Sequence, residues 1–375
     1  MKQQSVRNCI VALVVLFSYM SCSSDAGEHK SITQSVTDRV QYARGFVISN
    51  DSSCIITRSP SDTSRIYSIY SFDSNHETIQ NSNYIQIPQS IKRCVCLSST
   101  HIAFLSALGL KDKIVGVPDT TYIFDKQIKQ AIKNGTINMV SRGGGIDQEI
   151  LLALNPEIIF ADLSMKNELG FFENMGIPVV YVEEYNETTP LGRAEWIRLF
   201  GAFFYIPEKA DSIFNSITDK YNAIVAQVAL FNGPKPTIFG GMEYQGVWYV
   251  SGGASYIANL YHDAGAEYLF ADNVLTGSRP LDFEVVYDKA MDANYWRIMQ
   301  GSSENLTFSA IEQWNRHYVD FEAFKNHTII VCNPSKVPYF ERGTLEPHVV
   351  LADFVSILHP EVLPDHNPVY YHLLK

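Results

Sequence analysis

One long amphipathic segment in the middle of the chain constrains the fold more than any other feature. Between Pro207 and the pair Gly233-Pro234, one set of apolar residues recurs at alternating four- and three-residue steps. This spacing places them on a single helix face, and about 24 residues at 1.5 Å each give a rod of roughly 36 Å. The periodicity alone is typical of an ordinary core helix. The position of the segment, between two series of strand and helix patterns, is more informative. Its apolar face is Ala210, Phe214, Ile217, Tyr221, Ile224, Val228 and Phe231.

Alternating strand and helix patterns lie on both sides of this helix. Strands are expected at 92–97, 114–117, 157–161 and 177–182 before it, and at 237–240, 295–299 and 328–332 after it. Helices are expected at 101–108, 122–133, 146–154, 168–175, 192–204, 254–264, 283–291 and 345–358. Such alternation predicts parallel sheets covered on both faces. The expected fold is therefore α/β, with two Rossmann-like lobes joined by a single long rigid helix.

Shorter strand patterns precede the first lobe, at 45–48, 54–57, 65–72 and 84–87, with Ser, Asp, Asn and Pro clusters between them. They predict a small antiparallel β extension at the N-terminal side. The expected division is a signal peptide at 1–21, a lipid-anchored linker at 22–39, the β extension at 40–90, the N-terminal lobe at 91–206, the connecting helix at 207–232 and the C-terminal lobe at 233–375.

The first residues form a targeting segment. Lys2 and Arg7 precede an apolar run at 9–17, which is too short to span a bilayer of about 30 Å. Cys22 follows small Ser21 and precedes a polar stretch, which resembles a bacterial lipobox although Tyr19 stands where leucine is usual. We expect lipidation at Cys22 and a cell-envelope location, facing the periplasm or at the cell surface. Simple cleavage, or an unmodified Cys22, is the alternative.

The other mature cysteines, Cys54, Cys94, Cys96 and Cys332, do not form a CxxC motif. Cys94 and Cys96 alternate with apolar residues, and Cys332 ends the apolar run 328–332. We interpret them as buried free thiols in strands, although their spacing leaves disulfide pairing open.

Charge and motifs exclude several classes of function. The formal net charge is −11, and no Lys or Arg run offsets it locally, which argues against nucleic-acid binding. The sequence contains no HExxH, no GxSxG and no close histidine pair, so we expect no enzymatic activity and no bound cofactor or resident metal. Gly143-Gly144-Gly145 lacks the spacing and the lysine of a phosphate loop.

From about residue 85 to 372, the order of these elements resembles the helical-backbone class of periplasmic binding proteins, which deliver ferric siderophores, haem or cobalamin to ABC importers. The resemblance implies a non-catalytic monomer that binds a metal chelate between its lobes and docks on permease and ATPase subunits. The similar segments are 97–110 with 113–117, 150–159 with its Asn155-Pro156-Glu157, 175–179, the turn Ser251-Gly252-Gly253 and the stretch 263–266.

Ligands of open α/β sheets bind at the carboxyl ends of the strands. Aromatic faces and arginines in the predicted loops would suit a large chelate with polar edges. Core packing is the alternative for each aromatic residue, and Arg142 could instead support its glycine turn. The candidates are Tyr122, Arg142, Trp248, Tyr249, Arg279, Tyr339, Phe340 and Arg342.

The resemblance also implies one permease-docking glutamate on each lobe. Glu284 matches the position in the second lobe, and Glu168 lies near the expected place in the first. A ferric siderophore is the expected ligand, and cobalamin or haem is the alternative, since 339–342 resembles a segment of the cobalamin branch. A receptor for bare zinc or manganese, or a surface protein that captures ligand without a permease, also stays open.

Overall fold

The computed structural model describes residues 38–50, 53–72, 84–142 and 144–375, so Cys22 and the predicted signal segment lie outside the described residues. The first lobe is built on a five-stranded sheet of order β11-β10-β5-β6-β7, in which every pairing is parallel. Its strands are β5 (Cys94–Cys96), β6 (Ile114–Val117), β7 (Asn138–Met139), β10 (Ile158–Ala161) and β11 (Val179–Tyr181). Strands β5, β6, β10 and β11 are buried along their whole length, as expected for a parallel sheet covered on both faces.

The helices of this lobe begin where the sequence provides caps. The Ser98 side chain accepts a hydrogen bond from Thr100 N, and Asp125 accepts from Gln127 N and Ile128 N. The second cap explains why the predicted helix at 122–133 begins only at Lys126. The helices are α2 (Ser99–Ala107), α3 (Lys126–Lys133), α4 (Gln148–Ala153) and α5 (Lys166–Asn174). The 3-10 turns are η2 (Lys111–Lys113), η3 (Leu163–Met165) and η4 (Glu184–Asn186). A short strand pair is formed by β8 (Ser141–Arg142) and β9 (Gly145–Ile146).

The second lobe repeats the plan with the order β15-β12-β17-β18-β19, parallel except for the last strand. Its strands are β12 (Thr237–Gly240), β15 (Glu267–Tyr268), β17 (Tyr295–Met299), β18 (Ile329–Cys332) and β19 (His372–Leu373). Its helices are α8 (Tyr256–Asp263), α9 (Phe283–Ala290), α10 (Phe308–Trp314), η5 (Arg316–Asp320), α11 (Glu322–Lys325), the π-helical turn η6 (Tyr339–Gly343) and α12 (Pro347–Leu358).

An additional antiparallel sheet in this lobe corrects one sequence prediction. Strands β13 (Glu243–Tyr244), β14 (Val247–Ser251) and β16 (Ser278–Leu281) pair in the order β13-β14-β16. Trp248 and Tyr249 therefore lie in a strand and not in the predicted loop. Along β14 Trp248 and Val250 are buried while Tyr249 is exposed, which is the two-residue alternation of a half-buried strand.

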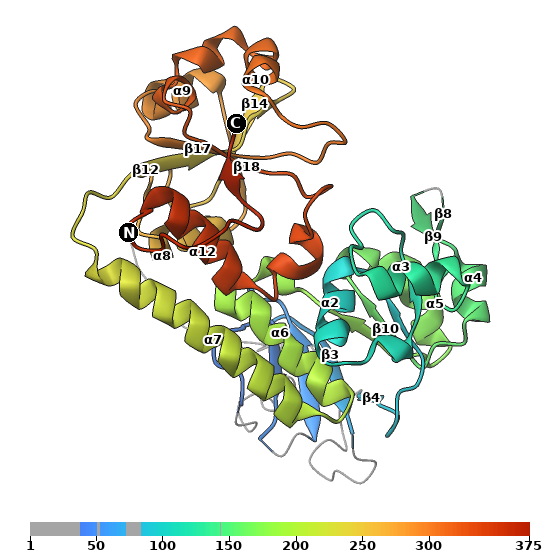
Figure 1. Ribbon diagram of the computed structural model, residues 1–375. Coiled ribbons are helices and arrows are strands. Elements are labelled where there is room, and N and C mark those ends of the chain that lie inside the picture. The colour runs from blue at the N-terminus through green and yellow to red at the C-terminus, as the bar shows by residue number, and fades with distance from the viewer. Residues whose placement is uncertain (1–37, 51–52, 73–83, 143) are drawn as a thin grey trace, which may run out of the picture. The chain divides into compact units, whose positions relative to one another are not determined.

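Helices α6 (Pro190–Phe203) and α7 (Pro207–Leu230) lie side by side between the two series, as Figure 1 shows. Helix α7 is the predicted long helix, and its buried face comprises Ala210, Phe214, Ile217 and Tyr221. It is bonded to both lobes: Lys209 Nζ donates to Leu108 O (2.8 Å), and Tyr221 Oη donates to Asp263 Oδ2 (2.6 Å). The predicted two-lobed α/β fold with one connecting helix is confirmed.

The N-terminal extension consists of β1 (Phe46–Ile48), β2 (Cys54–Arg58), β3 (Ile66–Ser71) and β4 (Ile85–Gln86). The first three strands are antiparallel as predicted, whereas β4 pairs with β3 in parallel. The extension is held by two buried carboxylates, Glu187 after η4 and Glu195 in α6, which accept from Gly45 N (2.8 Å) and Ala43 N (2.8 Å). In addition, Tyr70 Oη of β3 donates to Val179 O in β11 (2.8 Å).

Cys94, Cys96 and Cys332 are free thiols buried in strands, as predicted, and Cys54 is buried in β2. Within the described residues, no helix combines the length and the apolar character needed to cross a membrane.

Candidate functional site

A cavity of about 620 Å³ is lined by residues of both lobes. Four strands of the first lobe contribute residues that follow their carboxyl ends: 97–101 after β5, Tyr122 after β6, Asp162, Ser164 and Met165 after β10, and Val182, Glu184 and Tyr185 after β11. The second lobe contributes Tyr256 from α8 and residues after β18, and α6 contributes Arg193. The cavity therefore lies where open α/β sheets bind ligands.

Aromatic side chains form much of its wall. Tyr122 and Phe340 meet edge to face across the lobes, with ring centroids 4.9 Å apart, and Phe340 also contacts Tyr339 at 5.7 Å. Phe340 remains 38% exposed, so its ring is accessible to a ligand. Tyr185 is similarly exposed at the other side of the lining. Exposed aromatic rings in a concave site bind large flat ligands well, because they bury area with little loss of side-chain freedom.

Arg193 is the only arginine or lysine among the described residues that line the cavity. Its guanidinium lies 3.9 Å above the ring centroid of Tyr256, a cation–π contact. Nε donates to Glu187 O (3.1 Å) and Nη2 donates to Tyr185 O. The side chain is therefore held in place by one ring and two backbone carbonyls.

A buried histidine and a buried glutamate face each other at the cavity. His101 Nε2 lies 4.0 Å from Glu184 Oε2, and both side chains are at least nine-tenths buried. Burial lowers the pKa of His101 to about 4 and raises the pKa of Glu184 to about 7, since each charged form loses its hydration. Glu184 Oε2 has no hydrogen-bond partner among the described residues.

Two further acidic residues lie beside this pair. Asp162 lines the cavity and accepts a hydrogen bond from Ser164 N (2.7 Å). Glu183 is buried, and its carboxylate accepts from Leu163 N (3.3 Å) and Asn186 Nδ2 (2.7 Å). Burial raises the pKa of Glu183. The first-lobe wall is therefore acidic.

The π-helical turn η6 joins the lobes next to the cavity. Glu341 is buried, and its carboxylate accepts hydrogen bonds from Phe124 N (2.8 Å) and Asp125 N (3.1 Å) of the first lobe. Thr100 Oγ1 donates to Phe340 O (3.0 Å), and Ser99 Oγ donates to the same oxygen (3.2 Å). These bonds fix Phe340 against the beginning of α2 and hold this edge of the cavity closed.

The structure brings three of the predicted ligand residues, Tyr122, Tyr339 and Phe340, together in this cavity. Arg342 follows them in sequence but lies outside the lining, where it forms an ion pair with Glu346 (3.0 Å).

The β13-β14-β16 sheet carries three other predicted ligand residues, and none of them is in the lining. The Trp248 side chain is fully buried in the second-lobe core, with its Nε1 donating to Gly240 O (3.1 Å). Tyr249 is exposed on the opposite face of β14, and Arg279 in β16 lies 3.5 Å from Asp272. Trp248 therefore lies on the buried face of β14 and has a core-packing role.

The remaining predicted residues lie elsewhere on the first and second lobes. The backbone of Arg142 forms β8 with Gly145 as its partner, and its side chain lies outside what the structure describes. Glu168 is exposed on α5 and accepts a hydrogen bond from Ile146 N (3.1 Å). Glu284 is exposed in the first turn of α9. Both glutamates are accessible to a partner.

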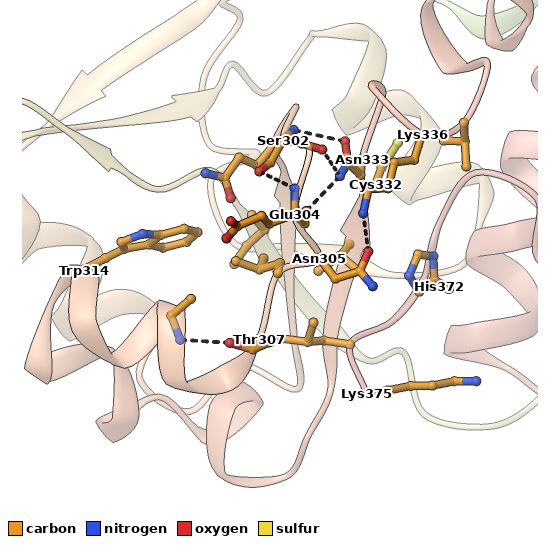
Figure 2. Close-up of a pocket in the computed structure, with 17 residues that line it drawn as sticks. Ser302, Glu304, Asn305, Thr307, Trp314, Cys332, Asn333, Lys336, His372 and Lys375 are labelled. Carbon is orange, nitrogen blue, oxygen red and sulfur yellow. Dashed lines mark hydrogen bonds between the residues drawn. The ribbon is translucent and has the colours of Figure 1, made fainter. Parts of the chain in front are cut away.

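A second cavity of about 590 Å³ is lined only by residues 298–375 of the second lobe. Figure 2 shows hydrogen bonds among several of its lining residues: Asn333 Nδ2 donates to Ser302 O (2.8 Å), and Lys336 Nζ donates to Asn305 Oδ1 (2.6 Å). The inter-lobe cavity is the stronger candidate for a ligand site, because both lobes line it at the carboxyl ends of strands. The described residues include no cluster of three His, Cys, Asp or Glu side chains that could hold a metal ion.

Sequence reasoning missed His101, Asp162, Glu184, Arg193 and Tyr256. Asp162 and Glu184 directly follow predicted strands, so their position at strand ends was a usable signal. His101, Arg193 and Tyr256 lie in helices, where periodicity cannot distinguish a cavity-facing residue from a core residue.

Two α/β lobes, one connecting helix and an aromatic cavity between the lobes are the features of a ligand-binding protein. The chain belongs to the periplasmic binding protein family, whose model matches residues 94–335. The matched region extends from β5 to the loop after β18, so it includes the first-lobe strand ends of the cavity, together with Arg193 and Tyr256. The lining residues Tyr339, Phe340 and Thr344 lie beyond its end.

Several known proteins are similar to this chain. An uncharacterized lipoprotein of Methanocaldococcus jannaschii is 28% identical over 75% of this chain and 68% of its own length. A periplasmic heme binding protein from Pseudomonas aeruginosa superposes with a TM-score of 0.60 at 20% identity, over 76% of this chain and 98% of that one. The periplasmic vitamin B12 binding protein BtuF of Vibrio cholerae gives a TM-score of 0.53 at 16% identity, over 73% and 98%. At these identities the two solved structures show the fold alone.

Proposed function

We propose that this chain is the substrate-binding lipoprotein of an ABC importer and binds one large metal chelate in the inter-lobe cavity. A ferric siderophore is the first candidate, and cobalamin or haem is the alternative. The observation that carries the proposal is the cavity itself, which joins the carboxyl ends of the first-lobe strands to the aromatic rings of η6. Its volume is within the usual range for small-molecule sites, about 300–1,000 Å³.

The first test is binding by the full-length chain in mild detergent, followed by native mass spectrometry and visible absorption. The chain is incubated with cyanocobalamin, haemin and a panel of ferric siderophores. We expect a one-to-one coloured complex with one of these classes. Retention of zinc or manganese with no chelate bound would favour the bare-metal alternative.

Variants locate the site. Tyr122→Ala and Phe340→Ala each remove an aromatic face from the cavity, and we expect each to weaken binding by about tenfold or more. Tyr249→Ala is the matched control, because Tyr249 is an exposed aromatic residue outside the lining. Equal effects of the three changes would argue against this cavity as the site.

Delivery to a permease would use the exposed carboxylates of Glu168 and Glu284, which can pair with arginines through charge-assisted hydrogen bonds. We expect Glu168→Lys and Glu284→Lys to abolish ligand uptake by cells while leaving binding by the purified monomer unchanged. Unchanged uptake would favour surface capture without a permease. Lipid attachment at Cys22 is tested with Cys22→Ser, which we expect to release the protein from membranes.

A further inference from the structure

The charges around the inter-lobe cavity are unequal on its two sides. The first-lobe wall contains Asp162 and Glu184, and Glu183, the neighbour of Glu184 in sequence, is also buried. Among the described residues of the lining, the single cation is Arg193, which already donates to two backbone carbonyls and lies against the ring of Tyr256. The first-lobe wall therefore has more carboxylate acceptors than the surrounding donors can satisfy.

Glu184 provides a second and independent observation. Its side chain lines the cavity and is 94% buried, yet Oε2 has no hydrogen-bond partner among the described residues. His101 Nε2 lies 4.0 Å from this oxygen, which is beyond hydrogen-bond distance. Buried carboxylate oxygens are normally paired, so an unpaired oxygen at a binding cavity indicates a missing donor.

We infer that the first-lobe wall of this cavity recognises a cationic or neutral chelate that presents N–H donors, and that it excludes chelates with net negative charge. This inference rests on the proposed chelate-binding function. An ammonium or amide N–H group of the ligand would supply the missing donor for Glu184 and a second donor contact for Asp162. A ferric tris-catecholate or a haem with two free carboxylates would place like charges against the same wall, which is unfavourable in a desolvated site.

The test compares chelates that share one scaffold and differ only in charge. Ferrioxamine B, which has a free ammonium group, is compared with its N-acetyl and N-succinyl derivatives. Cyanocobalamin is compared with derivatives in which one propionamide is hydrolysed to a carboxylate. Haemin and a ferric tris-catecholate complete the panel. Binding is measured by calorimetry on the full-length chain in mild detergent.

Within the scaffold that binds, we expect the cationic or amide chelate to have an affinity about tenfold or more higher than its carboxylate counterpart. A tenfold difference in Kd corresponds to about 1.4 kcal/mol. Glu184→Gln should reduce this preference to less than about threefold, because it removes the charge and retains the shape. Glu304→Gln, in the second cavity, is the matched control and should leave the preference unchanged.

The outcomes separate the inference from the function on which it rests. Tighter binding of haemin, the tris-catecholate or the carboxylate derivatives would overturn the inference and leave chelate binding intact. Equal affinity within a scaffold, or a preference that survives Glu184→Gln, would overturn it as well. Failure of every chelate to bind would remove the proposed function and the inference together.

Discussion

Replacing Glu195 by glutamine tests how the N-terminal extension is held on the two-lobed fold. Glu195 is fully buried in α6, and its carboxylate accepts backbone hydrogen bonds from Gln41 (2.9 Å), Tyr42 (2.6 Å) and Ala43 (2.8 Å). The same carboxylate accepts from Arg198 Nη1 (2.6 Å). Glutamine has nearly the same shape, so the change alters charge and hydrogen bonding with little change in packing.

The expected loss follows from counting donors. The amide oxygen of glutamine can keep the two bonds of Oε2, to Tyr42 N and Ala43 N. The amide NH₂ then faces the part-buried N–H of Gln41 and the buried guanidinium of Arg198, so both of these donors lose their acceptor. Each donor left without an acceptor costs about 1–3 kcal/mol, so we expect a loss of about 2–6 kcal/mol. With an unfolding entropy of about 2.1 cal/mol/K per residue, this corresponds to a fall in Tm of roughly 3–8 °C.

Thermal unfolding followed by circular dichroism measures this loss, and hydrogen exchange of residues 41–43 shows where it arises. Glu312→Gln on α10 is the matched control, since Glu312 is exposed, and it should shift Tm by less than about 1 °C. An unchanged Tm for Glu195→Gln, or unchanged protection of the three amides, would refute the view that this carboxylate anchors the extension.

Three further predictions concern other buried groups. In urea unfolding, Glu341→Gln should lower the free energy of unfolding by about 1–3 kcal/mol, because one of the two first-lobe backbone donors loses its acceptor. Arg342→Gln is the control: it breaks only an exposed ion pair and should lower it by less than about 1 kcal/mol. Asp353→Asn should speed amide exchange at 369–371, whose three N–H groups donate to the buried Asp353 carboxylate, and unchanged exchange would contradict this. Glu184 has a raised pKa, so its stabilising contribution is full below about pH 4.5 and is lost by about pH 7; His101 has a lowered pKa, so its contribution is full above about pH 6.5 and is lost towards pH 4. These two effects oppose each other in the wild-type chain, so each variant should expose the other group. The free energy of unfolding, measured from pH 4 to pH 7, should fall with pH in His101→Gln and rise with pH in Glu184→Gln, by up to about 3 kcal/mol each. Slopes of the same sign in the two variants would refute the assignment.

The fold could be predicted because its strands and helices have clear periods. Buried parallel strands appear as short apolar runs, and the face of α7 repeats over more than six turns. The β13-β14-β16 sheet was missed because its strands are short and separated by a long connection. The alternation of Trp248 and Val250 with Tyr249 was the available signal, and it would have placed Trp248 in the core.

The site was only partly predictable, for a physical reason. Tyr122, Tyr339 and Phe340 lie in segments that follow strands, and strand ends can be identified from sequence. Arg193 and Tyr256 reach the cavity from helices, so their position depends on how α6 and α8 pack against the lobes. The unpaired oxygen of Glu184 depends on three-dimensional packing and has no counterpart in the sequence pattern.

The same packing connects the extension to the ligand site. Glu187 binds the backbone N–H groups of Arg44 and Gly45 in the extension, while its own carbonyl oxygen accepts from Arg193 Nε at the cavity. Tightening or loosening of the extension should therefore shift Arg193 relative to Tyr256. For this reason we expect Glu195→Gln to weaken chelate binding as well as stability, whereas the Glu312→Gln control should change neither.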